Sequence, residues 1–256
     1  MLNIQGLSKT WGRDTMDERV ALDQVSLQLR KGEFLTVIGG NGSGKSTLLN
    51  LIAGVHQPDA GRIYLDGVDL TALPEHRRAA HLSRVFQDPL LGSAGGMTVE
   101  ENLALAARRG RRRGLCWGIT SAERASFKKM LAQLELGLEE RMSSRVGLLS
   151  GGQRQALTLL MAAMRDPKLL LLDEHTAALD PKTAARVLAL TNRIVGEYGL
   201  TTIMVTHSMR DAIDCGGRLI MMREGRIVYA AEGVQKNGLK AADLIGKFQS
   251  DAPAAC

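Results

Sequence analysis

The stretch of sequence that decides the fold reads GGNGSGKST and occupies residues 39–47. It matches the pattern G-x-x-x-x-G-K-[ST]. An apolar run at residues 34–38 comes directly before it, and apolar side chains at helical spacing follow it as far as Gly54. Short apolar runs are typical of buried strands, and a glycine after a periodic run is typical of a helix end. The sequence therefore predicts a strand, a glycine-rich loop and a helix in direct succession.

This loop predicts a site for a polyphosphate. Glycines adopt positive φ values that turn successive backbone N–H groups inward, and the helix N-terminus adds partial positive charge. Lys45 is expected to reach the β- and γ-phosphates, and the Ser46 hydroxyl to ligate Mg²⁺. The alternative is a glycine-rich turn that only joins a strand to a helix. The residues expected to bind the nucleotide are Gly39, Asn41, Gly42, Ser43, Gly44, Lys45, Ser46 and Thr47.

Two carboxylates follow a second apolar run. Residues 169–172 are four leucines, and Asp173 and Glu174 come next. The C-terminal ends of parallel strands meet at one edge of a sheet, so these carboxylates are expected to face the loop. Asp173 is then the Mg²⁺ partner, and Glu174 polarises a water in line with the γ-phosphate. By itself, an apolar run that ends in two acids is more often a solvated strand end.

A third motif separates this chain from kinases and GTPases. Residues 149–153 read LSGGQ and stand directly before a helical run at residues 154–165. Ser150, Gly151 and Gly152 place further backbone donors at a helix N-terminus, which predicts a second anion-binding site. With these three motifs in this order, the chain resembles the nucleotide-binding subunits of ATP-binding cassette (ABC) transporters, whose signature is LSGGQ. The resemblance extends from about residue 2 to about residue 230.

The resemblance implies further roles, residue by residue. Trp11 stands where the family keeps an aromatic side chain that stacks on adenine, and Asp180 where it keeps a contact across a dimer. Gln87 resembles the glutamine that senses Mg²⁺ and the attacking water, and His207 resembles the histidine that contacts the γ-phosphate. An ordinary structural tryptophan and an ordinary structural histidine are the alternatives for Trp11 and His207.

The chain departs from the family after Glu174. The family commonly has Pro-Thr-Ser-Ala-Leu-Asp there, and this chain has HTAALD at residues 175–180. Ala177 therefore lacks a hydroxyl near the dimer contact. His175 either titrates beside Glu174 or is a neutral structural histidine in place of proline, and the sequence favours the second interpretation.

The family arrangement implies a head-to-tail homodimer. Each ATP would be held by residues 39–46 of one copy and by Ser150, Gly151, Gly152 and Gln153 of the other. One chain carries a single set of motifs, and a two-fold interface uses the same patch twice, so two composite sites form. Glu174 then activates water, His207 steadies the γ-phosphate, and hydrolysis removes the link that held the dimer shut.

The expected fold class is α/β: a P-loop NTPase (RecA-like) core with a mostly parallel sheet, an N-terminal antiparallel β subdomain and an inserted α-helical subdomain. Hairpins are expected at residues 66–67 and 224–225, where glycine follows an acidic residue. The whole chain, 1–256, is expected to form one ABC ATPase domain. Within it, residues 1–88 and 166–230 form the core, 89–165 the helical subdomain and 231–256 a helical tail.

Composition restricts the class of protein and the cellular compartment that are expected for this domain. Hydrophobic residues make up 45% and charged residues 23%, which excludes a disordered or collagen-like chain. Three separated cysteines, with no CxxC spacing, favour a reducing compartment over disulfides or zinc. No leader or membrane-crossing run is visible, so the expected location is the cytoplasmic face of the inner membrane, bound peripherally to a separate permease.

The resemblance favours import, with a solute-binding protein outside the membrane, over the alternative of a lipid or lipoprotein extruder. Residues 173–183 and 219–225 resemble a group associated with amino-acid-like substrates of the tryptophan or tyrosine kind. The net charge of +6 would also suit nucleic acid. However, DNA-repair ABC ATPases carry long heptad insertions and translation-associated ones carry two cassettes, so no nucleic-acid partner is expected. The basic run at 108–113 either meets anionic headgroups or is a solvated loop.

Overall fold

The computed structural model describes residues 1–110 and 118–250, which contain two β-sheets. The smaller sheet is antiparallel, in the order β2-β1-β4-β5, and is built from β1 (Leu2–Trp11), β2 (Arg19–Leu29), β4 (Ala60–Leu65) and β5 (Val68–Asp69). The larger has the order β10-β9-β3-β8-β7-β6, from β3 (Phe34–Gly39), β6 (Leu82–Val85), β7 (Leu169–Asp173), β8 (Thr202–Val205), β9 (Arg218–Arg223) and β10 (Arg226–Glu232).

The larger sheet is parallel except at one edge. β3 pairs in parallel with β8 and β9, and β7 pairs in parallel with β8 and β6, whereas β10 runs antiparallel to β9. Every residue of β3 and β8 is buried, as expected for parallel strands covered on both faces. The hairpins expected at Asp66-Gly67 and Glu224-Gly225 are confirmed by the β4/β5 and β9/β10 pairs.

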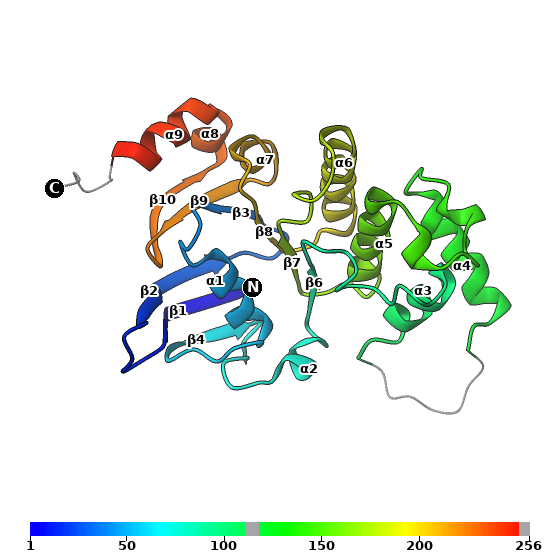
Figure 1. Ribbon diagram of the computed structural model, residues 1–256, viewed down its shortest axis with the longest axis horizontal. Helices are drawn as coiled ribbons and strands as arrows, with labels where there is room; N and C mark the ends of the chain where they lie inside the picture. Colours follow the sequence, from blue (N-terminus) through cyan, green and yellow to red (C-terminus); the bar gives the residue numbers. More distant parts are fainter. Residues whose placement is uncertain (111–117, 251–256) are drawn as a thin grey trace.

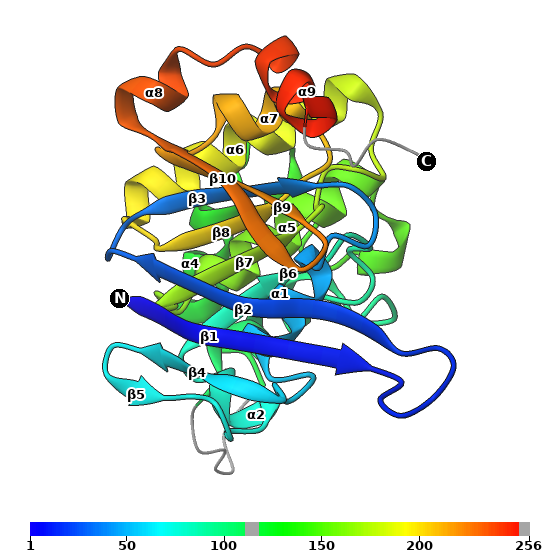
Figure 2. The ribbon, with the colours of Figure 1, turned by 90° about the vertical axis from the view of Figure 1, so that its left-hand side faces the viewer.

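Helices cover both faces of this sheet (Figures 1 and 2). Helix α1 (Lys45–Ala53) buries its leucines in a core shared with both sheets. The opposite face packs against α5 (Gly151–Ala163) and α6 (Pro181–Tyr198), in one core with α3 (Val99–Ala107) and α4 (Ser121–Ala132). The α/β fold, with its mostly parallel sheet and separate antiparallel sheet, is thus the expected one.

Three helices, α3, α4 and α5, begin with a capping box. Thr98, Thr120 and Ser150 each form a capping box with the residue three positions on, at the starts of α3, α4 and α5. Such a box satisfies two backbone donors that a helix start leaves unpaired. The remaining helices are α2 (Glu75–Arg78), α7 (Met209–Asp214), α8 (Gly233–Asn237), α9 (Ala241–Ser250) and the 3₁₀ turns Leu138–Glu140 and Val146–Leu148.

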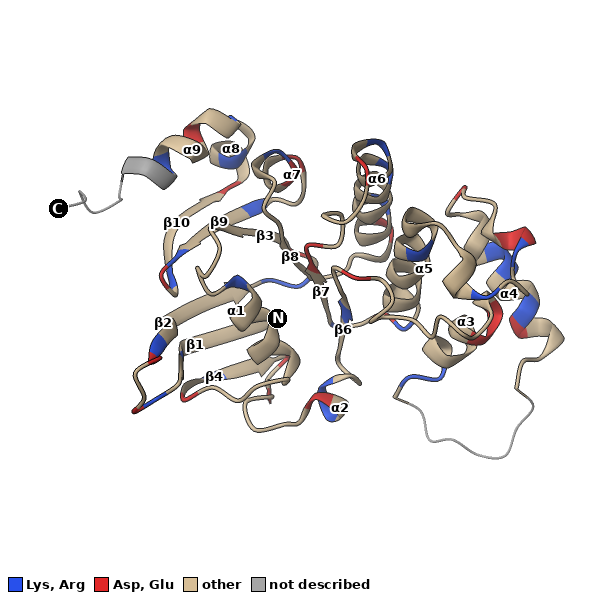
Figure 3. Ribbon diagram, viewed as in Figure 1, with Lys and Arg blue, Asp and Glu red and all other residues tan. Residues whose placement is uncertain are grey.

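The basic run at residues 108–113 is described only as far as residue 110, and the rest lies outside the described residues. The Arg108 guanidinium lies 3.1 Å from the Glu123 carboxylate, and Arg109 donates a hydrogen bond to the carbonyl of Ala162. Figure 3 shows acidic and basic residues mixed along neighbouring α4. These two arginines therefore bind the protein itself.

Candidate functional site

The phosphate loop joins β3 to α1 and is closed by Lys45. This side chain is 5% exposed, and its ammonium donates to the carbonyl oxygens of Gly39, at 2.8 Å, and Gly40, at 3.0 Å. Burial lowers the pKa of Lys45, and the nearby carboxylates of Glu174 and Asp173 oppose that shift. The predicted lysine and the two predicted acids therefore lie within electrostatic reach of one another.

Backbone geometry in the loop depends on glycine at residue 44. Gly44 caps α1 at φ 100°, in the left-handed region, and a Cβ there would lie 2.4 Å from the carbonyl oxygen of Ala21. Any side chain would thus be strained and would clash with β2. The Ser43 hydroxyl oxygen is buried and has no hydrogen-bond partner among the described residues. An unpaired buried polar atom of this kind fits a loop that accepts a polar ligand.

The oxygen donors proposed for Mg²⁺ come from three elements. Ser46 is the exposed second residue of α1, Asp173 ends β7, and Gln87 lies exposed two residues beyond β6. Hydroxyl, carboxylate and amide oxygens are the hard ligands that Mg²⁺ accepts, so the donor set fits this ion. The Asp173 carboxylate also accepts from Arg84, with 2.5 Å between Nη2 and Oδ2.

Glu174 and His207 meet at the ends of neighbouring strands β7 and β8. Nε2 of His207 lies 2.6 Å from Oε1 of Glu174. Glu174 has φ 45°, an uncommon value for a residue other than glycine, and its backbone N–H donates to the carbonyl of Val205 in β8. The two residues expected to act on water and on the γ-phosphate are therefore brought together.

The signature residues form the start of α5. The Ser150 hydroxyl accepts from the Gln153 backbone, and the Gln153 side chain accepts from the Ser150 backbone. This box leaves the N–H groups of Gly151 and Gly152, in the first helical turn, without intrahelical partners. Gly152 also permits close packing on α6, since a Cβ there would lie 2.2 Å from Cγ2 of Thr183.

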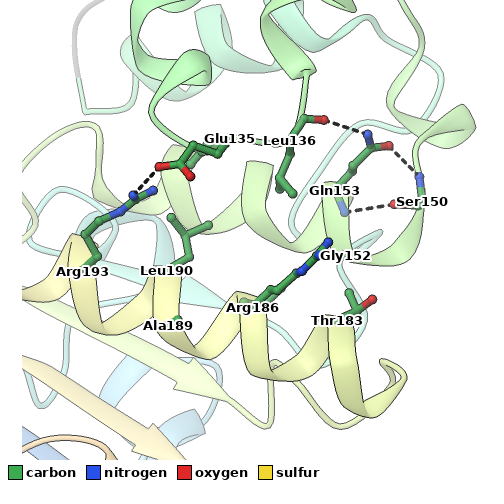
Figure 4. A pocket seen from close by; sticks show the side chains of 12 residues that line it. Glu135, Leu136, Ser150, Gly152, Gln153, Thr183, Arg186, Ala189, Leu190 and Arg193 are labelled. Carbon is green, nitrogen blue, oxygen red and sulfur yellow. Dashed lines mark hydrogen bonds and ion pairs between the residues drawn. The ribbon is translucent and has the colours of Figure 1, made fainter.

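An open pocket of about 880 Å³ adjoins the signature (Figure 4). Its walls are the start of α5, one face of α6 and residues 134–136, and it contains Ser150, Gln153, Arg186 and Arg193. Arg193 is held by Glu135 at 2.9 Å, whereas the exposed Arg186 extends along α6 toward Gly152 in Figure 4. None of the lining residues comes from the phosphate loop at 39–47.

Trp11 ends β1 and pairs across the strands with Arg19 of β2. Its ring stands edge-on to His56, with 4.8 Å between centroids, and the Lys9 ammonium lies 5.0 Å from the ring centroid. Arg19 donates to the carbonyl of Gly42 at 3.1 Å. The predicted aromatic residue is therefore connected to the phosphate loop through its strand partner.

Two residues of the 175–180 segment have clear structural partners. The Asp180 carboxylate caps α6 by accepting from the Thr183 backbone, and hydrogen bonds from the side chain and the backbone of Thr183 lower the pKa of Asp180. His175 is 1% exposed, and burial lowers its pKa to about 4. Its Nε2 lies 2.9 Å from the Thr191 hydroxyl, which itself donates to Val187. Burial therefore favours the neutral form of His175, and because the one hydroxyl proton of Thr191 goes to Val187, Nε2 of His175 donates to the Thr191 oxygen.

Three residues that contact the site are not marked by any motif: Arg84, Asn50 and Arg19. The only local feature of Arg84 is a single charge within the short, otherwise uncharged run LSRVF. Neither Asn50 nor Arg19 carries a sequence signal, because each acts through a residue far away along the chain.

A phosphate loop ahead of a helix, a strand that ends in two carboxylates and an LSGGQ helix together define an ATP-binding cassette. Residues 22–177 match the family model described as ABC transporter. The chain belongs to the ABC transporter family, as an ATP-binding subunit whose ATPase activity is coupled to transport. None of the helices in the described part of the chain combines the length and apolarity that crossing a bilayer requires.

Relatives carry several transport names. The chain is 42% identical to the tyrosine transport ATP-binding protein of Clostridioides difficile (strain R20291), over 97% of this chain and 99% of that protein. It is 37% identical to the putrescine transport ATP-binding protein PotG of Escherichia coli (strain K12), over 91% of this chain but 57% of the relative. The chain is 36% identical to the energy-coupling factor transporter ATP-binding protein EcfA1 of Symbiobacterium thermophilum, over 98% of this chain and 85% of that protein.

Solved cassettes share the fold. One is a dimeric ATP-binding cassette in a post-hydrolysis state with ADP and phosphate, at a TM-score of 0.77 and 29% identity, covering 91% of this chain and 98% of that one. Another is the ADP conformation of an ATP-binding cassette of an ABC transporter, at a TM-score of 0.79 and 26% identity, covering 98% of this chain and 99% of that one. Cassettes of this family dimerise and pair with membrane permease components.

Proposed function

We propose that this chain powers the import of an amino-acid-like solute, of the tyrosine or tryptophan kind, through a separate permease at the cytoplasmic face of the inner membrane. The relative of nearly equal length, a tyrosine transport ATP-binding protein, supports this substrate class. A further relative, named for spermidine/putrescine import, supports the direction. A solute-binding protein outside the membrane belongs to the same proposal.

Two copies close around ATP and Mg²⁺ in the proposed cycle. One observation carries this: the pocket beside Ser150 contains no residue of the loop around Lys45. The two anion-binding helix starts of one protomer therefore do not share that pocket, and in the proposed dimer the second copy brings its own helix start to the triphosphate. Each composite site would use Lys45 and Ser46 of one copy and Ser150 of the other.

Chemistry in the composite site is assigned to this chain's own residues. Glu174 accepts a proton from the attacking water, and His207 donates to the γ-phosphate. Ser46, Asp173 and Gln87 would hold Mg²⁺, which supplies charge for the phosphate oxygens when bound. Hydrolysis then removes the γ-phosphate that links the copies, and the dimer opens.

Complementation tests the composite site. One variant, Lys45→Ala, lacks the lysine that binds the phosphates. The other, Ser150→Phe, places a bulky side chain at the start of the signature helix. A mixed dimer holds one site with both defects and one with neither, so equal mixing is expected to restore ATP hydrolysis that each variant lacks alone. Each chain acting by itself would give no restoration on mixing.

Uptake tests the substrate class. The chain and the permease with which it assembles are placed in vesicles, and ATP-dependent entry of labelled tyrosine, tryptophan, putrescine and a phospholipid probe is compared. The proposal expects entry of an aromatic amino acid that stops with Glu174→Gln. Entry of putrescine alone, or movement of lipid outward, would contradict it.

A further inference from the structure

Arg84 is a nearly buried cation next to the proposed metal site. It belongs to β6, between Asn50 of α1 and Asp173 of β7, and its side chain is 12% exposed. Nη2 donates to Oδ2 of Asp173 at 2.5 Å, and Nη1 donates to Oδ1 of Asn50 at 2.7 Å. The guanidinium carbon lies 4.8 Å from the ring centroid of Phe86. One planar group is thus fixed from three sides.

The two oxygens that Arg84 binds belong to α1 and β7, two of the three elements that supply the proposed Mg²⁺ ligands. Asn50 follows Ser46 by four residues in α1, so the two side chains lie on one helix face, one turn apart. Asp173 is the proposed carboxylate ligand from the other side. Arg84 therefore ties α1 to the end of β7 one helical turn from the Ser46 hydroxyl.

We propose that Arg84 is a positioning residue for Mg²⁺ in the nucleotide site, an inference that rests on the proposed role of Mg²⁺ with ATP. Its guanidinium holds Oδ2 of Asp173, which leaves Oδ1 as the oxygen for the ion. Its bond to Asn50 fixes the separation between that carboxylate and Ser46. Arginine suits this task because its donors form a rigid planar fork, whereas the ammonium of lysine is a point charge.

Mg²⁺-dependent nucleotide binding measures this role without hydrolysis. A fluorescent ADP is bound to the full chain, first in EDTA and then at rising MgCl₂ concentration. In Arg84→Met, the Mg²⁺ concentration for half-maximal gain in affinity is expected to rise about tenfold, which is typical for loss of a group that orients a metal ligand. Affinity in EDTA is expected to stay unchanged, and Arg84→Lys to give a smaller rise.

Two further variants separate positioning from folding. Asn50→Ala removes the hydrogen bond between Arg84 and Asn50 but leaves Arg84 paired with Asp173. It is therefore expected to fold and to raise the Mg²⁺ requirement less than Arg84→Met. Arg124→Met removes an arginine–carboxylate pair with Glu100, 2.7 Å apart, outside the site and is expected to leave the Mg²⁺ requirement unchanged. Thermal unfolding in EDTA checks that every variant is folded.

The proposed metal role itself would be overturned if the ADP affinity of wild-type protein did not depend on Mg²⁺. Normal Mg²⁺ dependence in wild type, with no shift in folded Arg84→Met and Asn50→Ala, would overturn the role of Arg84 alone. A lower Mg²⁺ requirement in Arg84→Met would also overturn it, because Arg84 would then compete with the ion for Asp173.

Discussion

Nε2 of His207 lies 2.6 Å from Oε1 of Glu174, across the C-terminal ends of neighbouring strands. The carboxylate is 12% exposed and the imidazole 45% exposed. The acid is therefore held largely inside the protein, and the histidine forms its solvent-facing side.

Glu174→Gln is expected to bind ATP normally and to lose turnover by about 10²-fold or more, the usual contribution of a general base. The amide preserves shape but accepts no proton, so a closed ATP-bound dimer accumulates. Steady-state ATPase and light-scattering mass with ATP measure the two effects. Near-normal turnover would reject Glu174 as the base.

Lys45→Ala is expected to weaken ATP binding by about 10²-fold, because a charged hydrogen bond contributes about 1.5–3 kcal/mol. Equilibrium titration with a fluorescent ATP measures the affinity. Lys168→Ala is the matched control, since Lys168 is a half-exposed lysine paired with Asp66 outside the loop. Unchanged affinity in Lys45→Ala would refute the phosphate assignment.

Trp11→Ala tests adenine stacking, which contributes about 1–3 kcal/mol per base on an aromatic side chain. ATP affinity is expected to fall by about 5- to 150-fold, and Trp11→Phe is expected to retain most of it. Binding of inorganic tripolyphosphate, which has no base, should be the same in all three proteins. Equal losses for ATP and tripolyphosphate would mean that Trp11 supports the loop and not the base.

The site residues that the sequence indicated are those whose geometry is local. The loop around Lys45, the strand end at Asp173 and the helix start at Ser150 each depend on neighbouring residues, so contiguous motifs predict them. The fold class follows in the same way, because continuous apolar runs such as residues 169–172 mark buried parallel strands.

What the sequence could not indicate is pairing across the chain. Arg84 and Asp173 are 89 residues apart, and only the parallel pairing of β6 with β7 brings them together. The neutral, structural interpretation of His175 agrees with its burial, but its partner Thr191 lies on α6, and nothing local identifies it. Side-chain partners of this kind depend on tertiary packing, which a motif does not encode.

Thr191→Val is expected to lower the free energy of unfolding by about 1–3 kcal/mol, because the buried N–H of His175 loses its acceptor. Thr191→Ser keeps the hydroxyl and should lose less. Denaturant titration of the two variants beside wild type measures the difference. A loss in Thr191→Ser with none in Thr191→Val, which keeps the methyl group, would indicate that packing of the methyl group, and not the hydrogen bond, is what matters.

Lys236 gives the chain a measurable dependence of stability on pH. This side chain of α8 is fully buried, donates to the carbonyls of Cys215 and Gly216 at the end of α7, and has its pKa lowered to about 8 by burial. Between pH 8 and the ordinary lysine pKa of 10.5, the unfolded chain holds a proton that the folded chain has released. The contribution of Lys236 to stability therefore increases as pH rises through this window.

Comparison with Lys236→Met isolates that contribution. The free energy of unfolding of wild type, relative to the variant, is expected to rise by about 2 kcal/mol between about pH 7.5 and about pH 9.5. Burial also raises the pKa of Cys215 to about 11, which lowers stability at high pH, but that thiol is present in both proteins and largely cancels. Urea unfolding at several pH values provides the measurement. A difference that stays constant with pH would show that the Lys236 ammonium keeps its proton inside the folded protein.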